Sequence, residues 1–564
     1  MKKLLPFILL YFFYGNCYSQ NFELKIMGSS PLETKTIDSL GYLKLHQNLS
    51  SATNSIHKIT QELQKSGYIE NQVLKSQKIN DSSYQVHLKL GRKIKQLQIF
   101  VEKDILTDNL FLNKRKDSII LPITDLDVFV QNTLHQLEDE GYPLSKIHFV
   151  PTHIKGKTLH TQLKINTNVQ KNVDDLLLTS LDGSHNKFPS SHLFQIKKKY
   201  LHKKITKKRI RKIHNEFKEL RFINTLKYPE ILFLKDTTKL YVYIEKNNAN
   251  RFDGFIGFNN NADNKLKING YLNLNLENTI HSGESFMLLW KNDGNKQTAF
   301  KTSLEIPYIF KSRFAIRSEL GIFKQDSIFQ NTKIELNLGY LLNYNTKLYL
   351  GYATTTSSDI QNQNSATITD YKNIFYKLNF EYTKKDSNNA LFETETSFLV
   401  RCGIGQRNNP LENNTLNQSK QYFIESESSY NLHLSSNTYF NLRNKSYILH
   451  SKHYLDAELY RFGGINSIRG FEEGILQANQ YFLFLTEYNY IANNKLKLHT
   501  ILDYSLLKNN HLPKKQTTLL ALGAGITIKN KDSFLKISLA NGSEKIQSVR
   551  FKNSLLHFSY LVKF

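Results

Sequence analysis

The chain has 564 residues and a formal net charge of +26, with 40% hydrophobic and 12% aromatic residues. This length exceeds that of one typical domain, so several domains are expected. The positive charge would suggest nucleic acid for a cytoplasmic protein, whereas an exported protein meets anionic lipid first. No apolar run after the N-terminal leader is long enough for a membrane-spanning helix, but the composition also fits strands that alternate between lipid and a polar lumen.

The first 19 residues have the pattern of an export signal. Lys2 and Lys3 precede an apolar stretch, and small or polar residues follow up to Ser19. This order is typical of a secretory signal peptide, so we expect residues 1–19 to be removed. Cys17 would leave with the signal, because Asn16 before it is a poor fit to lipoprotein processing. Cys402 would then be alone, which excludes an internal disulfide in the mature chain.

One pattern recurs three times between residues 22 and 246: an amphipathic helix, a sharp turn and two strands. The turns are Gly67-Tyr68, Gly141-Tyr142 and Arg221-Phe222, at a spacing of roughly 75 to 80 residues, which suits a tandem of small α+β domains. We predict these domains at residues 20–92, 93–168 and 169–250. The predicted helix faces are Ala52, Ile56, Ile59 and Leu63; Leu126, Val130, Leu134 and Leu137; and Ile210, Ile213, Phe217 and Leu220.

A basic run lies in the third repeat, between Lys197 and Lys212. Such runs are often solvated helix faces. The alternative is that this domain rests on the anionic headgroups of a membrane leaflet. Nucleic-acid binding is disfavoured by the export signal.

Residues 251–564 follow a different pattern, in which apolar and polar residues alternate over strands of about ten residues, the length that crosses a bilayer. Roughly sixteen strands are counted. A soluble β-sandwich would alternate too, but the predicted connections sort by parity. Those after odd-numbered strands are long, as at Thr355–Asp370 and Gly403–Lys420, whereas those after even-numbered strands are short, as at Asn345-Thr346. This sorting is typical of an outer-membrane barrel. The predicted fold is therefore tandem α+β domains followed by a roughly 16-stranded antiparallel transmembrane β-barrel.

A glycine-rich stretch, Arg461–Gly474, falls between predicted strands eleven and twelve. Its glycines indicate a folded loop with tight turns. A confined Arg469 would need a carboxylate partner. Asp503 and Glu487 are in phase with inward-facing positions of the next two strands; the alternative is that both are ordinary lumen-lining residues.

The sequence resembles the outer-membrane insertase and translocase superfamily that includes BamA and TamA. The repeats resemble its periplasmic POTRA domains, and the layout is similar to TamA. The resemblance implies that the sixth external loop folds into the barrel and that its arginine meets acids of nearby strands. In the matching strand Asp503 is retained, but Ile501 and Ser505 depart from the family's Phe and Gly. The loop residues that match the motif are Gly463, Gly464, Ser467, Ile468, Arg469, Gly470 and Phe471.

The resemblance also implies a function without chemistry: assembly or translocation of client polypeptides in the outer membrane, with the N-terminal domains in the periplasm. The first and last strands would meet at a seam that opens laterally, because glycines weaken a strand. Clients and lipid are the expected partners, a further periplasmic or inner-membrane partner is left open, and no enzyme activity, cofactor, metal or nucleic acid is expected. The alternatives are a two-partner secretion transporter and a pore or surface-structural barrel. The predicted seam residues are Gly254, Gly257, Phe558, Tyr560 and Phe564.

Overall fold

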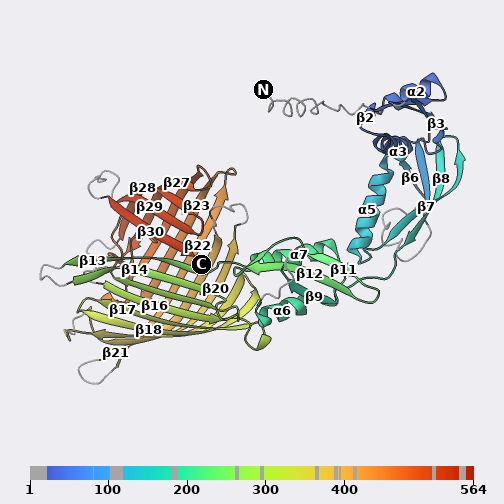
Figure 1. Cartoon of the computed structure of the whole chain (residues 1–564). Helices are drawn as coiled ribbons and strands as arrows, with labels where there is room; N and C mark the ends of the chain where they lie inside the picture. Colours follow the sequence, from blue (N-terminus) through green and yellow to red (C-terminus); the bar gives the residue numbers. More distant parts are fainter. Residues whose placement is uncertain are drawn as a thin grey trace, which may run out of the picture. The chain divides into compact units, whose positions relative to one another are not determined.

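The computed structural model contains three small four-stranded sheets followed by a closed barrel of sixteen antiparallel strands (Figure 1). This confirms the predicted fold class. The predicted signal peptide lies outside the described residues. None of the helices in the described ranges is long and apolar enough to cross a bilayer. The structure describes residues 22–80, 82–101, 118–180, 187–260, 266–292, 297–362, 367–386, 392, 395–410, 416–510, 516–544 and 554–564.

In each of the three small sheets the first strand pairs in parallel with the last strand. A parallel pair needs a crossover connection, and helices provide it here. The first sheet contains β1 (Phe22–Gly28), β2 (Leu45–His46), β3 (Gln72–Asn80) and β4 (Ser83–Lys89); the second contains β5 (Gln96–Val101), β6 (Ser118–Pro122), β7 (Lys146–Lys155) and β8 (Thr158–Asn166); the third contains β9 (Asp175–Thr179), β10 (Ile223–Thr225), β11 (Glu230–Phe233) and β12 (Thr238–Lys246). The accompanying helices are α2 (Pro31–Asp38) and α3 (Leu49–Lys65), α5 (Leu126–Asp139), and α6 (Ser190–Tyr200) and α7 (Lys207–Glu219).

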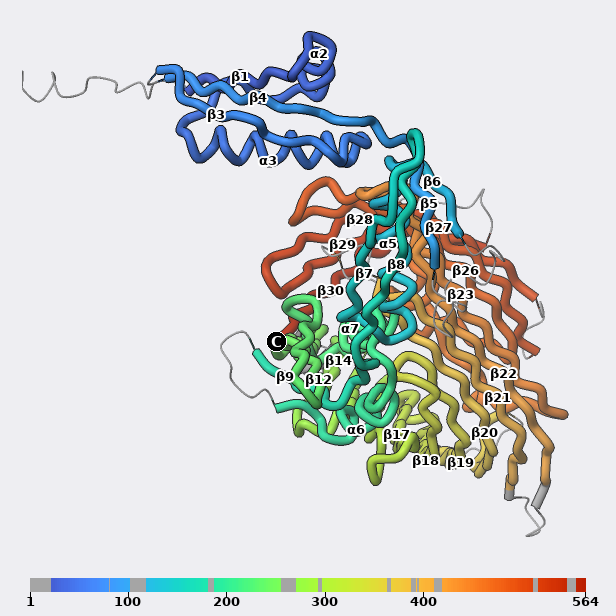
Figure 2. The backbone as a smooth tube through the Cα atoms, turned by 90° about the vertical axis from the view of Figure 1, so that its right-hand side faces the viewer, coloured from blue at the N-terminus to red at the C-terminus, as the bar shows by residue number. Residues whose placement is uncertain are grey.

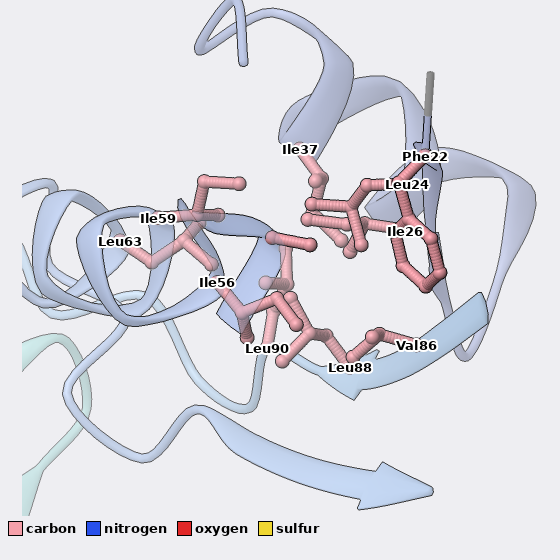
Figure 3. Close-up of a cluster of buried hydrophobic side chains, with 11 residues drawn as sticks. Phe22, Leu24, Ile26, Ile37, Ile56, Ile59, Leu63, Val86, Leu88 and Leu90 are labelled. Atoms are coloured by element: carbon pink, nitrogen blue, oxygen red, sulfur yellow. The ribbon is translucent and has the colours of Figure 1, made fainter. Parts of the chain in front are cut away.

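The core of the first domain lies between α3 and the sheet. Asn48 caps α3 by accepting a hydrogen bond from the Ser51 N–H at 2.9 Å, as expected for an N-cap asparagine. The predicted face of α3 is buried and points toward the strands (Figure 3). The side chains that form this core are Phe22, Leu24, Ile26, Ile37, Ala52, Ile56, Ile59, Leu63, Val86, Leu88 and Leu90.

The sequence pattern did not predict two kinds of element in the repeats: the short helices α2 and α6, and the first strand of each sheet. The buried side of α6 consists of His192, Ile196 and Tyr200, so only one aliphatic residue marks it within a basic run. A 3-10 turn, Ile123–Asp125, precedes α5, and the N-cap residue of that helix, Asp125, makes no side-chain capping bond.

The turns after the main helices form the joints between successive domains. Gly67 and Gly141 have φ angles of +102° and +91°, a conformation that glycine adopts without steric cost at a helix end. The Gly67 carbonyl accepts a hydrogen bond from the Ile94 N–H at 2.8 Å, and the Gly141 carbonyl accepts one from Lys171 at 2.9 Å. In the third copy the Arg221 carbonyl accepts from the Asn247 side chain at 2.8 Å. The joint is therefore repeated, with an arginine where the glycine stood.

Arg221 and α6 attach the third sheet to the barrel, and both belong to the same compact unit as the barrel. The Arg221 guanidinium lies 3.0 Å from Glu395 and 3.7 Å from Glu277. His192 of α6 is buried edge-on against Tyr308, with ring centroids 4.6 Å apart. The His192 ring also covers Gly283 so closely that a Cβ there would lie 2.0 Å from it.

The barrel strands alternate as predicted. In the sixth strand, Ile334, Leu336 and Leu338 are exposed on the outer wall, whereas Glu335 and Asn337 are buried. The strands are β13 (Arg251–Asn260), β14 (Leu266–Glu277), β15 (Ser285–Asn292), β16 (Gln297–Ile306), β17 (Phe314–Gln325), β18 (Phe329–Asn343), β19 (Thr346–Asp359), β20 (Tyr371–Lys385), β21 (Glu395–Pro410), β22 (Leu416–His433), β23 (Thr438–Ser451), β26 (Gln480–Ile491), β27 (Leu496–Lys508), β28 (Gln516–Asn530), β29 (Ser533–Ser543) and β30 (Leu555–Lys563).

Several strands run further than the predicted connections allowed. The stretch Gly403–Lys420, predicted as a connection, continues β21 to Pro410 and begins β22 at Leu416; likewise, β19 continues past Thr355 to Asp359. The extensions are polar, and backbone hydrogen bonds do not require apolar side chains, so pairing continues beyond the apolar belt. Side-chain pattern alone therefore set these strand ends too early.

The barrel closes between its first strand, β13, and its last strand, β30, which leads to the C-terminus marked in Figure 2. This seam is short: the register joins Arg251, Phe252 and Asp253 with Lys563, Val562 and Leu561. In contrast, β13 pairs with its other neighbour over all of Arg251–Asn260. Since ladder hydrogen bonds hold neighbouring strands together, the seam is held by less pairing than the junction beside it.

His192 gives the attachment of the third domain a predicted pH dependence. Burial lowers the pKa of His192 to about 3; Lys347 lowers it further and Glu305 opposes this. His192 is therefore neutral in the folded protein. Its contribution to the stability of the docked α6 is complete above pH 6.5, the ordinary pKa of histidine. As the pH falls below 6.5, docking of α6 should weaken by up to ~1.4 kcal/mol per pH unit. Hydrogen exchange of α6 in the full-length protein, compared between pH 7.5 and 5.5, measures this.

The variant His192→Phe should lose this pH dependence, because the phenyl ring fills the site without titrating. His153→Phe, on the exposed part of β7, serves as the matched control and should behave as the wild type. Equal acid sensitivity of wild type and His192→Phe would contradict the assignment.

Candidate functional site

The candidate site is the connection between β23 and β26, barrel strands eleven and twelve, as counted from the sequence. It contains a 3-10 turn (Asp456–Glu458) and a hairpin of β24 (Tyr460–Phe462) and β25 (Leu476–Ala478), which pairs apart from the barrel sheet. Phe462 and Ile468 of this connection are buried among side chains of the barrel wall. We call residues 452–479 the lumen loop.

Glycines allow the loop to fold tightly and to approach the wall. Gly463 and Gly470 have φ angles of +120° and +78°, values that favour glycine. A Cβ on Gly463 would lie 2.4 Å from the Glu472 carbonyl oxygen within the loop. A Cβ on Gly470 would lie 2.4 Å from the backbone nitrogen of Gly542 in β29. The tip therefore lies directly against the barrel backbone.

Arg469 occupies the centre of the site and is 1% exposed. Its Nε donates to Asp503 Oδ2 at 2.8 Å and its Nη2 to Asp503 Oδ1 at 2.5 Å. The Arg469 backbone N–H also donates to Asp503, and Nη1 donates to Glu487. Such a two-pronged contact uses the planar geometry of the guanidinium fully. The structure thus brings the loop arginine together with both carboxylates that the sequence singled out.

Two further cations, which the sequence analysis did not identify, lie next to Glu487. Lys536 Nζ of β29 lies 2.9 Å from Glu487, and Arg443 Nη2 of β23 lies 3.4 Å from it. Because the barrel brings β23, β26, β27 and β29 around one point, two acids here face three cations. Arg443 lies two residues after Asn441 on β23, so the two side chains are on the same face of the strand. This spacing was the sequence signal that could have identified Arg443 as a residue of the lumen.

Apolar contacts and the last strand hold the loop tip as well. Ile468 is buried with Leu483, Leu485 and Ala521 of the wall. The Phe471 ring covers Gly542 so closely that a Cβ on that glycine would lie 2.4 Å from it. The Gly470 N–H donates to His557 Nε2 of β30 at 3.4 Å.

The loop also reaches the opposite side of the seam. Glu473 forms an ion pair with Lys291 of β15, and the Gly474 carbonyl accepts a hydrogen bond from Gln297 of β16. Contacts with β29 and β30 on one side and β15 and β16 on the other mean that the loop bridges the seam from inside the barrel.

The remaining predicted residues are placed as follows. The Ser467 N–H donates to the Gly464 carbonyl at 3.1 Å. Gly254 follows the last seam register pair, and Gly257 pairs with Asn269 of β14. Phe558 and Tyr560 are exposed on the outer wall.

Two contacts join the ends of the barrel at the seam. The Phe564 N–H donates to the Asn250 carbonyl at 3.1 Å. Asp253 of β13 accepts hydrogen bonds from Ser559 of β30 at 3.1 Å and from Tyr271 of β14 at 2.7 Å, a bridge that the sequence did not reveal.

The fold and the site define a class: a sixteen-stranded barrel with POTRA-like domains and a lumen loop fixed by an arginine. Within the described residues no group of three or more His, Cys, Asp or Glu side chains could hold a metal ion. No protein-family model matches the sequence, and no curated protein matches it either.

Solved structures share this fold. CdiB from Escherichia coli is similar with a TM-score of 0.51 and 13% identity, over 90% of this chain and 98% of CdiB. CdiB from Acinetobacter baumannii is similar with a TM-score of 0.50 and 13% identity, over 84% of this chain and 90% of that one. The chain therefore shares the fold of these two CdiB structures. Such a barrel with POTRA domains is consistent with the outer membrane and with N-terminal domains in the periplasm.

Arg469→Ala should destabilise the barrel strongly, because it leaves Asp503 buried without its ion-pair partner, whereas Glu487 keeps Lys536 and Arg443. Removing one side of a buried ion pair costs about 3–5 kcal/mol. Arg469→Ala with Asp503→Ala should cost less than the sum of the single changes. Urea unfolding in detergent, followed by emission of the one tryptophan, Trp290, measures both.

Arg461→Ala is the matched control for this measurement. Arg461 belongs to the same loop and lies over the Phe323 and Phe329 rings at 5.3 and 5.6 Å, so its loss should cost about 1 kcal/mol. Equal effects of the two substitutions would contradict a special role of the Arg469 pair.

Proposed function

We propose that this protein is an outer-membrane assembly factor that inserts or translocates client polypeptides. A client segment adds as a strand to a sheet edge of the periplasmic domains and then pairs with barrel strands at the opened seam. The protein acts without covalent chemistry and without a cofactor.

The short register between β13 and β30 carries this proposal. Separating the two strands breaks the pairing of only three residues on each side, and exposes N–H and C=O groups that template an incoming strand. Gly254, the first residue beyond that register, is one point at which β13 bends away readily.

The edge strand β3 supports the capture step. It lies at the edge of the first sheet, and most of its side chains are exposed, including Val73, Leu74 and Ile79. An open edge with exposed apolar side chains fits β-augmentation, in which main-chain hydrogen bonds supply affinity for many sequences.

A disulfide across the seam tests the proposal. Cysteines replace Phe252 and Val562, which are register partners, in a Cys402→Ser background. The protein is reconstituted in vesicles of phosphatidylethanolamine and phosphatidylglycerol, and an unfolded eight-stranded outer-membrane barrel is the probe client. Oxidation should reduce the protease-resistant fraction of the probe at least tenfold, and reductant should restore it.

A second disulfide provides the control. Cysteines at Leu274 and Leu288, register partners of β14 and β15, lock a junction away from the seam and should leave insertion unchanged. Full insertion by the seam-locked protein would reject the lateral route.

Secretion through the lumen is the second candidate, since the two solved structures reported above as similar in fold are CdiB proteins. That route requires the lumen loop to leave its place, whereas lateral insertion does not. A short thiol crosslinker between cysteines at Phe471 and Gly542, which lie in contact, fixes the loop. Loss of transport only in the loop-fixed protein would favour secretion, and loss only in the seam-locked protein favours insertion.

A further inference from the structure

A group of exposed apolar and basic side chains lies where the third domain meets the barrel turns. Phe310 is 97% exposed at the tip of the turn between β16 and β17, Ile280 is 71% exposed in the turn between β14 and β15, and Phe194 of α6 is 43% exposed. The basic residues Lys198, Lys311 and Arg313 are exposed beside them. We call these six residues the junction patch.

The members of the patch are held together by specific contacts. Gln195 of α6 donates to the Lys311 carbonyl at 2.5 Å, and Lys311 Nζ lies 5.8 Å from the centroid of the Phe194 ring. His192 of the same helix packs on Tyr308 of one turn and on Gly283 of the other. One helix therefore joins both turns.

Both turns are built to present an apolar tip. Tyr308, Phe310 and Lys311 have φ angles between +51° and +55°, a left-handed conformation that is strained for residues with side chains. In the other turn Glu284 accepts hydrogen bonds from the Ile280 and Ser282 N–H groups at 2.7 and 3.1 Å. Hydrogen bonds to Glu284 thus hold the Ile280 turn, and the Phe310 turn keeps its ring exposed in spite of a costly backbone conformation.

The patch continues the lipid-facing surface of the barrel. Leu304 and Ile306 of β16 and Phe314 and Ile316 of β17 are exposed on the outer wall and flank the Phe310 turn on both sides. This turn follows an even-numbered strand, on the side where the third domain enters the barrel. Aromatic side chains with neighbouring lysine and arginine are typical of a membrane–water interface.

We propose that the junction patch is a membrane-binding surface that inserts Phe310, Ile280 and Phe194 among the acyl chains of the periplasmic leaflet, while Lys198, Lys311 and Arg313 bind anionic phospholipid headgroups. The occupant is lipid rather than a client, because the apolar tips adjoin the lipid-facing wall and the charges complement phosphate. The surface would keep the third domain at the membrane beside the barrel, independently of whether the seam inserts or secretes clients.

A tryptophan reporter tests this inference in the full-length protein. In a Trp290→Phe background, Phe310→Trp is reconstituted in vesicles of phosphatidylethanolamine with and without one-third phosphatidylglycerol, including lipids brominated on the acyl chains. We expect blue-shifted emission and at least threefold stronger quenching by brominated lipid than for the control. The control is Leu232→Trp, in β11, which is 43% exposed and pairs with the end of β12 remote from the barrel.

The basic residues and the second turn have their own measurements. The double change Lys198→Glu and Lys311→Glu should abolish the increase in quenching that phosphatidylglycerol causes. In vesicles of phosphatidylethanolamine alone, at least part of the quenching should remain. Ile280→Trp places a reporter in the other turn and should give the same blue shift and quenching as Phe310→Trp. The test therefore remains valid when one of the two substitutions disturbs its own turn. Solvent-like emission from both reporters, with quenching no stronger than that of Leu232→Trp, would overturn the proposal.

Discussion

A buried guanidinium fixes the arrangement of the lumen loop. Burying a charge is costly unless it is paired and hydrogen-bonded, and Arg469 meets this condition only when Asp503 and Glu487 stand at adjacent strands facing the loop. The Arg469 side chain donates to residues of β26 and β27, and Asp503 of β27 gains its ion-pair partner only when the loop is inside. The charge therefore makes the loop's position and the closure of the wall depend on each other.

The surroundings of Glu487 extend this dependence to more distant strands. Arg443 and Lys536 come from β23 and β29, so four barrel strands and the loop meet at a single cluster. Hydrogen-bonded charge networks in a low-dielectric interior act over more than one pair. A change at β29, which β27 and β28 separate from the loop's attachment at β26 and which lies next to the seam strand β30, is thereby felt at Arg469.

Local periodicity predicted the three repeats, the strand number and the inward direction of Glu487 and Asp503, whereas the resemblance to BamA and TamA implied that Arg469 meets such acids. Alternation along β26 places Glu487 inward wherever the strand begins, and the strand count alone brings it close to Asp503. Arg443 and Lys536 could not be assigned in this way, since their approach to Glu487 depends on barrel curvature and register across several strands. The helix α6 escaped for a different reason: its buried side is mainly His192 and Tyr200, which carry little apolar signal, and it packs on the barrel as well as on its own domain. Strand ends such as that of β21 failed because backbone pairing continues where the apolar pattern stops.

The short pairing at the seam and the contacts of the lumen loop together keep the barrel closed. Few ladder bonds join β13 and β30 directly, yet the loop holds β29 and β30 through Gly542 and His557, and β15 and β16 through Glu473 and Gly474. Closure is thus shared between backbone pairing at the seam and side-chain contacts behind it. In the proposed lateral opening, a small displacement of β30 would first break the three register pairs and strain the Gly470–His557 contact. The bonds of Arg469 to Glu487 on β26 and Asp503 on β27 do not involve β30, so β30 could move without removing the partners that hold the loop.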